Sequence, residues 1–182
     1  MRPMVELVKT GFFSDIKDSK SSRTFPMDQC QAIEAAVEEV PRSIFINSQT
    51  GQEIRKFDGL LAEELPGYEH EHDSDSGRNP KCKLWDNEGF DHSVHLYHPD
   101  DRIAVEVEKS ERKRVSDDLI KFNKGWKTQK SNRKKIEFGS IIVPVNYGGN
   151  GNIFAGSMKT MEFMRSFLFV EDIAVFGYRD PR

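Results

Sequence analysis

The stretch IAVEVE, residues 103–108, decides the fold of this chain. Side chains alternate between the two faces of a β-strand, so the branched apolar residues of this stretch are predicted to face the core together. Glu106 and Glu108 would share the opposite face, with two carboxylates side by side on a firmly anchored strand. The stretch therefore predicts a core strand that carries a polar site.

The segments around this strand alternate between strand and helix patterns. A polar turn, His98 to Asp101, precedes the strand, and a helix with apolar residues on one face follows it and is predicted to stop at Gly125. Alternating strands and helices favour an α/β fold, a central mixed β-sheet flanked by helices. The expected strands are 90–97, 102–108, 136–145 and 172–178, and the expected helices are 113–124 and 158–167.

The first 80 residues give weaker patterns. Residues 28–40 have the apolar spacing of an amphipathic helix, 43–47 are predicted to be a short strand, and 58–65 a further helix. Residues 69–80 are polar and acidic and are expected to form a loop. We expect one domain over residues 1–182, with 1–80 as a helical amino-terminal part and 90–178 as the core.

Charge is segregated along the chain. The net charge is only −3, but residues 62–76 hold six acids and no Lys or Arg, whereas residues 109–135 hold eleven basic residues against three acids. Such blocks indicate interaction surfaces. Two cysteines without short spacing, no signal peptide and no long apolar run predict a cytoplasmic protein with free thiols.

A third acid precedes the Glu-x-Glu pair. Asp91 lies fifteen residues before Glu106 on the preceding predicted strand, and a hairpin would bring the two together. Clustered carboxylates repel one another unless a cation compensates, and oxygen ligands favour Mg²⁺. A phosphodiester would supply further oxygens, and the metal would activate a water. A Glu-x-Glu pair on a strand is, however, often only a solvent-facing pattern.

An Asp followed by Glu-x-Glu resembles the signature of the PD-(D/E)XK nucleases. More narrowly, residues 103–125 (IAVEVEKSERKRVSDDLIKFNKG) resemble the catalytic strand and following helix of the BamHI, BglII and BstYI group of type II restriction endonucleases. The likeness continues through 136–145, 154–167 and 172–178. The proline that usually precedes the first acid is absent, since the chain reads Gly89-Phe90-Asp91.

The resemblance implies a restriction-endonuclease-like fold with residues 90–178 as its catalytic core. It implies that Asp91, Glu106 and the backbone carbonyl of Val107 bind Mg²⁺, with Mn²⁺ as a substitute, and that Glu108 acts as general base. The implied activity is endonucleolytic cleavage of double-stranded DNA at a short palindromic site. The implied partners are a second copy of the chain, in a homodimer, and a cognate DNA methyltransferase.

Three segments are candidates for DNA contact, because phosphate contacts give affinity and base-edge contacts give sequence choice. They are the start of the helix after Glu108, the basic connection that follows this helix, and the segment near residue 155. The candidate residues are Ser110, Arg112, Lys113, Arg114 and Asp117; Lys127, Lys130, Arg133 and Lys134; and Asn152, Ser157 and Lys159.

Several alternatives stay open at this level. The chain fits a repair, recombination or defence nuclease of the same superfamily, and also a DNA-binding protein without catalysis. An upstream acid between residues 63 and 75 is a further candidate for the active site. His92, His95 and His98 have no assigned role, although His95 is a candidate for phosphate contact.

Overall fold

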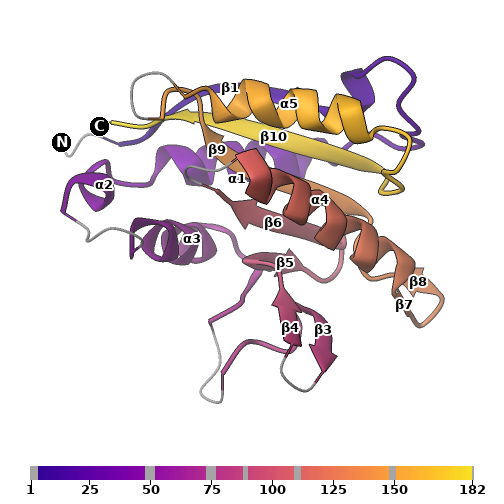
Figure 1. The fold of residues 1–182 in the computed structure, drawn as a ribbon. Coiled ribbons are helices and arrows are strands. Elements are labelled where there is room, and N and C mark those ends of the chain that lie inside the picture. The colour runs from indigo at the N-terminus through magenta and orange to yellow at the C-terminus, as the bar shows by residue number, and fades with distance from the viewer. Residues whose placement is uncertain are drawn as a thin grey trace.

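A computed structural model describes residues 4–47, 52–72, 77–87, 90–108, 112–147 and 151–181. Its centre is a six-stranded sheet of order β1-β10-β9-β6-β5-β2 (Figure 1). The strands β6, β9 and β10 run parallel, and the remaining neighbours pair antiparallel. The bounds are β1 Glu6–Phe12, β2 Glu69–His70, β5 Leu96–His98, β6 Ile103–Val107, β9 Phe138–Pro144 and β10 Asp172–Arg179.

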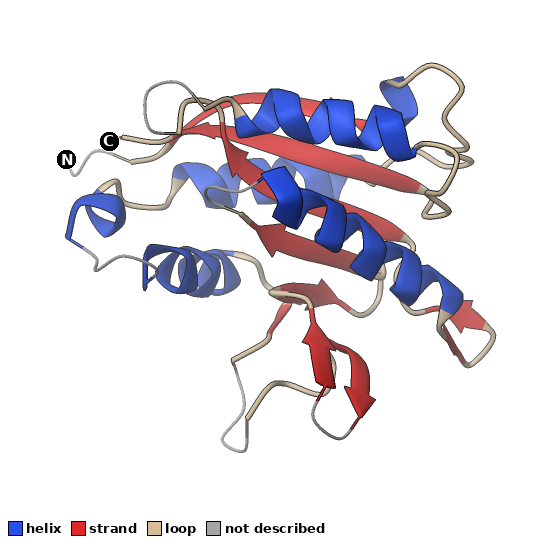
Figure 2. Cartoon of the chain, viewed as in Figure 1, coloured by secondary structure: helices blue, strands red, loops and turns tan. Residues whose placement is uncertain are grey.

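Helices cover both faces of this sheet (Figure 2), as expected for a mixed α/β protein. One apolar core lies between the sheet and α1 (Met27–Glu38) with α3 (Gln52–Glu64), and the other lies under α4 (Arg112–Lys127) and α5 (Ile153–Met164). The predicted alternation along β6 is confirmed. Ile103, Val105 and Val107 enter the first core, and Ala104 enters the second. The acidic face of β6 is therefore the face that meets α4.

Some predicted elements differ in the structure. Ser43–Asn47 forms the short helix α2 rather than a strand, because an apolar pattern over five residues fits either element. The helix α5 begins at Ile153, where the Asn152 side chain caps it by accepting the amide of Ala155 at 2.8 Å.

Gly125 lies inside α4 and does not end it. A β-carbon at this position would overlap the Ile136 side chain, so the glycine permits close packing of the helix on the chain that enters β9. The prediction of a helix stop at Gly125 was therefore wrong, and tertiary packing explains the residue.

The strand expected over residues 90–97 is divided in two. β4 (Phe90–Ser93) pairs with β3 (Lys83–Asn87) in a hairpin outside the main sheet, and β5 continues the main sheet. Val94 lies at the break and donates its amide to the carbonyl of Cys82 at 3.1 Å. In Figure 1 the β3–β4 hairpin projects below β5. The hairpin β7 (Gln129–Lys130) and β8 (Arg133–Lys134) projects at the far end of α4.

Candidate metal centre

Glu106 is the last-but-one residue of β6, at the carboxyl end of the parallel part of the sheet. Its side chain is 0% exposed, and Glu108 just beyond the strand end is also buried. The amide of Glu108 is held by the carbonyl of Ile142 on the neighbouring strand at 2.9 Å. Both carboxylates are thus fixed by the central strands of the sheet.

The helix α4 supplies two charged groups to these carboxylates. Lys121 Nζ lies 2.8 Å from Glu106 Oε1 and 3.4 Å from Asp118 Oδ1. Asp118 is 1% exposed and lies one helical turn from Lys121. Oxygen atoms of Glu106, Glu108 and Asp118 all lie within 4.8 Å of one another. The three acids therefore form a compact buried cluster with one ammonium group at its edge.

Lys121 satisfies one oxygen of Glu106 and one of Asp118. The second oxygens, Glu106 Oε2 and Asp118 Oδ2, are buried and have no hydrogen-bond partner. An unpaired buried carboxylate oxygen costs roughly 1–3 kcal/mol or more, so it needs a compensating charge. The orphaned oxygens and the all-oxygen donor set fit a hard divalent cation.

The shifts in pKa agree with a site in which three carboxylates face a single ammonium group. Burial, and then the proximity of Glu106, raise the pKa of Glu108 and raise that of Asp118 well above its usual range. Burial alone would lower the pKa of Lys121, but Glu106 and Asp118 raise it overall. Lys121 therefore stays charged, and its single positive charge balances only part of the negative charge of the three acids.

The histidine of this centre comes from the segment before β5. His95 Nδ1 lies 3.2 Å from Glu106 Oε2 and accepts the amide of Val107 at 3.0 Å. On its other side, His95 Nε2 lies 3.9 Å from Glu71 Oε1. The ring thus lies between the acidic cluster and Glu71, one of the upstream acids left open as a candidate for the site.

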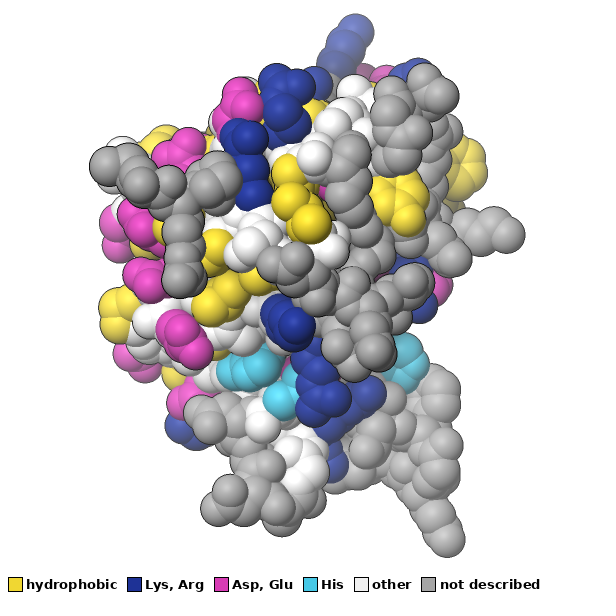
Figure 3. All heavy atoms as spheres, turned by 90° about the vertical axis from the view of Figure 1, so that its left-hand side faces the viewer, with side chains coloured by type: hydrophobic (Ala, Val, Ile, Leu, Met, Phe, Trp, Pro, Cys, Tyr) yellow, Lys and Arg dark blue, Asp and Glu magenta, His cyan; other side chains and the backbone are white. Residues whose placement is uncertain are grey.

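A cavity of about 780 Å³ opens beside the cluster. Glu108, Asp118 and Lys121 line it at the cluster, whereas Trp85 from the β3–β4 hairpin and Lys124 from α4 line its wall. Lys124 Nζ lies 4.1 Å from the centre of the Trp85 ring. Figure 3 shows histidine and basic side chains next to one another on the face at the carboxyl end of β6. The cavity therefore combines buried acids with cations suited to a phosphate backbone.

Asp91 is not brought to Glu106 by the expected hairpin. It pairs with Asp86 in the β3–β4 hairpin, whereas β6 pairs with β5 in a register that joins Leu96 to Val105. His95 therefore approaches Glu106 in its place. The expectation of a direct strand pair was wrong because the chain leaves the main ladder after Ser93. The Asp91 side chain lies outside the part of the chain whose side chains are described.

The DNA-contact candidates at the start of α4 lie near the cluster. Arg114 and Asp117 line the cavity and are exposed. Arg112 and Lys113 form the first turn of α4, but their side chains are outside the described set, and Ser110 lies outside the described residues altogether.

The basic connection lies elsewhere. The helix α4 returns from the carboxyl end of β6 to the opposite end of the sheet, so Lys127 is roughly 20 Å along the axis from Arg114 at 1.5 Å per residue. Arg133 and Lys134 lie on the hairpin beyond it (Figure 1). The structure does not bring this basic group, with Lys130, to the cavity. The connection therefore forms a surface separate from the acidic cluster.

The third candidate segment is the start of α5. Ser157 is fully buried and donates its hydroxyl to the carbonyl of Ile153 at 2.8 Å, so its prediction as a base reader was wrong. Asn152 caps the helix, and Lys159 is exposed on it. Ser157 is buried because it lies on the apolar face of α5, which begins at Ile153. The sequence pattern predicted a helix only from residue 158, and so placed Ser157 before it.

Sequence reasoning missed Asp118 and Lys121. The available signal was their position on α4: Asp118 follows Val115 by three residues and adjoins Leu119, so it lies on the apolar face that packs on the sheet. An acid on such a face, with a lysine one turn later, predicts a buried pair. The same reasoning was not available for His95, whose place depends on the break after Ser93.

Comparison with known proteins gives one family. The model of a family described as "Putative halobacteria restriction endonuclease" matches residues 5–178 of the 182-residue chain. No curated protein and no solved structure matches the chain. Among the helices that the structure describes, none has the length and apolar character needed to cross a bilayer. Because the match spans nearly the whole sequence, this chain belongs to that restriction endonuclease family.

Proposed function

We propose that this protein is a Mg²⁺-dependent endonuclease that hydrolyses phosphodiester bonds in double-stranded DNA, with Mn²⁺ able to replace Mg²⁺. The observation that carries the proposal is the pair of buried, unpaired oxygens on Glu106 and Asp118, beside Glu108 and Lys121. The proposed metal ligands are Glu106, Glu108 and Asp118. Asp91 stays a proposed ligand because its hairpin borders the same cavity. The carbonyl of Val107 stays a proposed ligand because it lies between Glu106 and Glu108 in the chain.

The protein groups would share the chemistry as follows. A divalent cation held by these carboxylates would polarise the phosphate and favour ionisation of a water. Glu108, whose pKa is raised by burial, would accept the proton of the attacking water as the new P–O bond forms. The P–O bond to the sugar would break, and the leaving sugar oxygen would take a proton from solvent water. Lys121 holds Glu106 in place and limits the repulsion between the acids. Arg114 and Lys124 bind backbone phosphates at the cavity wall.

We further propose that the enzyme is a type II restriction endonuclease of the BamHI, BglII and BstYI group. The Glu106-x-Glu108 pair supports this placement, because the group has a second acid or amide where most relatives have lysine. The proposed unit is a homodimer that cuts both strands of a short palindrome, since two-fold symmetry in the protein suits two-fold symmetry in the site. Its partner in the cell would be a methyltransferase that protects the same site.

The test is cleavage of phage or plasmid DNA with Mg²⁺, followed by mapping of the ends. Discrete fragments that share one short palindrome support restriction. Cutting only at junctions or modified bases would favour a repair or defence nuclease, and binding without any cutting would overturn the enzyme proposal. Glu106→Gln should abolish cleavage and retain DNA binding, whereas Glu162→Gln, on the exposed face of α5, should leave both unchanged.

A further inference from the structure

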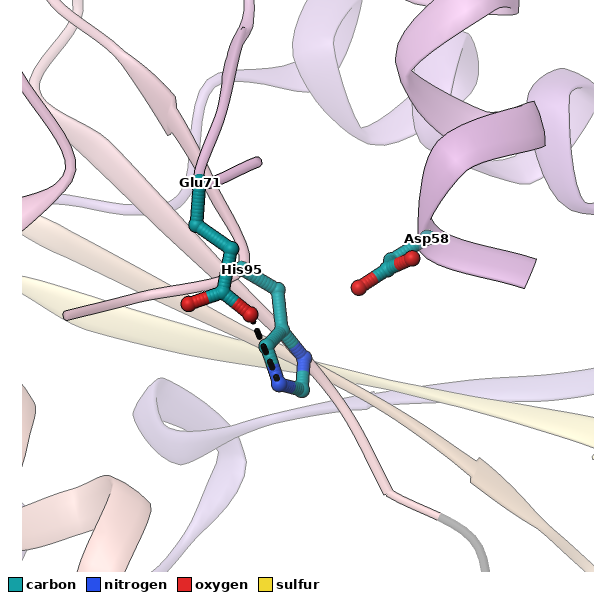
Figure 4. Close-up of side chains that lie close together, drawn as sticks. All are labelled: Asp58, Glu71 and His95. Atoms are coloured by element: carbon teal, nitrogen blue, oxygen red, sulfur yellow. Dashed lines mark ion pairs between the residues drawn. The ribbon is translucent and has the colours of Figure 1, made fainter. Parts of the chain in front are cut away.

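A second group of possible metal ligands lies beside the first, on different elements. Asp58 comes from α3, Glu71 follows β2, and His95 precedes β5 (Figure 4). One ligand atom from each lies within 4.8 Å of the other two. The acidic cluster on β6 and α4 offers oxygen only, whereas this group includes an imidazole nitrogen. The two groups therefore differ in the metal that they suit.

Asp58 supplies an independent sign of a missing ligand. It is 2% exposed, and its Oδ1 is buried without a hydrogen-bond partner. The nearest cationic candidate, His70 Nε2, lies 3.4 Å away but is not aligned for a hydrogen bond and is itself unsatisfied. Figure 4 shows the Asp58 carboxylate directed toward the space that Glu71 and His95 face. A cation in this space would compensate the buried charge.

The other two ligands are fixed in place by the surrounding chain. The Glu71 amide donates to the carbonyl of His95 at 2.9 Å, and the Ser93 hydroxyl donates to Glu71 Oε2 at 2.7 Å. Glu71 Oε1 then faces His95 Nε2 at 3.9 Å, with the half-buried His72 3.2 Å from the same oxygen. Oε2 of Glu71 is therefore fixed by Ser93, and Oε1 faces the space between Asp58 and His95.

The His95 ring has a hydrogen-bond acceptor next to the nitrogen that must carry the ring proton when the other nitrogen binds a metal. A cation on Nε2 needs the proton on Nδ1, and Glu106 Oε2 lies 3.2 Å from Nδ1 without a hydrogen-bond donor. Carboxylate, histidine and metal in this order form a common arrangement that fixes the ring. The Val107 amide, which now donates to Nδ1, would give up that contact. Binding at His95 is therefore coupled to the state of Glu106.

We propose that Asp58, Glu71 and His95 form a second divalent-cation site, distinct from the site at Glu106, Glu108 and Asp118. Because imidazole favours transition metals over Mg²⁺, this site selects a borderline ion such as Mn²⁺, Co²⁺ or Zn²⁺. The proposal goes beyond the nuclease function and does not require that the protein cut DNA. It predicts that the chain holds about two transition-metal ions but only about one Mg²⁺.

Metal binding to the full, chelator-treated chain tests this directly. Mn²⁺ binding is followed by electron paramagnetic resonance, and Co²⁺ binding by its visible absorption, which reports nitrogen ligation. We expect about two Mn²⁺ per chain, of which excess Mg²⁺ displaces about one. His95→Gln should remove the Mg²⁺-resistant ion, or weaken it at least about tenfold, and change the Co²⁺ spectrum. Glu108→Gln should weaken only the Mg²⁺-sensitive ion.

Two further variants keep the test decisive. His98→Gln changes a histidine on β5 that pairs with Asp101, outside the group, and should leave both ions bound. Asp58→Asn removes the unpaired charge and should have the effect of His95→Gln, which covers the case in which the latter does not fold. One Mn²⁺ per wild-type chain, or two retained in both His95→Gln and Asp58→Asn, would overturn the proposal. Two ions without DNA cleavage would instead refute only the nuclease function.

Discussion

Replacement of Lys121 by methionine should reveal how much positive charge the acidic cluster needs. The ammonium lies 2.8 Å from Glu106 Oε1, and at an effective dielectric constant of about 20 this pair is worth about 6 kcal/mol of Coulomb energy. The loss is limited, because a buried carboxylate left alone can take up a proton. At pH 7 protonation of a carboxyl group with an ordinary pKa near 4.3 costs about 4 kcal/mol, and at pH 5 about 1 kcal/mol.

The variant should therefore lose about 3–4 kcal/mol of unfolding free energy at pH 7 in the presence of a chelator. Burial and neighbouring acids already raise the pKa values of Glu108 and Asp118, and loss of the ammonium should raise them further. The penalty is therefore absent below the unfolded pKa values and grows as the pH rises. At pH 5 the loss should shrink to about 1 kcal/mol. Addition of Mn²⁺ should restore part of the stability, because a cation at the orphaned oxygens replaces the missing charge.

Urea denaturation at both pH values, with wild type measured in parallel, checks this prediction. Lys124→Met is the matched control. It removes a lysine one turn later on the same helix, exposed and stacked on Trp85, and should cost no more than about 1 kcal/mol at either pH. A loss below about 1 kcal/mol at pH 7 for Lys121→Met, or a loss independent of pH, would refute the reasoning that Lys121 neutralises the buried acids.

Three further outcomes follow from contacts away from Lys121. Gly125→Ala should destabilise the protein by about 1–3 kcal/mol in urea denaturation, because the added methyl group overlaps Ile136 despite the better helix propensity of alanine. Burial would raise the pKa of Glu137, but the two arginines that bind this carboxylate lower its pKa overall. The stability that Glu137 contributes is therefore present above its unfolded pKa and lost as the pH falls through the lower folded pKa. Glu137→Gln should accordingly make the unfolding free energy depend less steeply on pH in the acid range. In anisotropy titrations at several salt concentrations, Arg114→Ala should reduce the salt dependence of DNA affinity by about one counterion. Arg133→Ala, at the far end of α4, should reduce this salt dependence less. Equal effects of the two variants would contradict the placement of DNA over the cavity.

The sequence was sufficient to predict the central strand and its two acids. Alternation of apolar and acidic residues over residues 103–108 has few other solutions, and the structure places Glu106 at the carboxyl end of β6 as expected. The order of the later strands and helices was also predicted, because their apolar patterns are long. Short patterns were ambiguous, as residues 43–47 show by forming a helix.

The partners of the acids could not be predicted in the same way. His95 reaches Glu106 because the chain breaks from the main ladder after Ser93, and no local propensity marks that break. Glu71 is held near the centre by a backbone hydrogen bond to His95, a residue distant in the sequence. Only Asp118 and Lys121 gave a local signal, as an acid on the buried face of a helix with a lysine one turn later. Tertiary contacts therefore determine which charged groups complete the centre.

The position of β6 within the sheet has a consequence for the kinetics of the centre. β6 is an interior strand with both faces buried, so its amides should exchange with solvent only when the whole protein unfolds. Glu71 instead follows β2, a two-residue strand at the sheet edge, where brief local opening is enough to expose the backbone. The side of the centre formed by β6 should therefore keep its structure for as long as the protein is folded, whereas the side formed by Glu71 should open locally. Local opening at the sheet edge is therefore expected to expose Glu71 while Glu106 keeps its geometry.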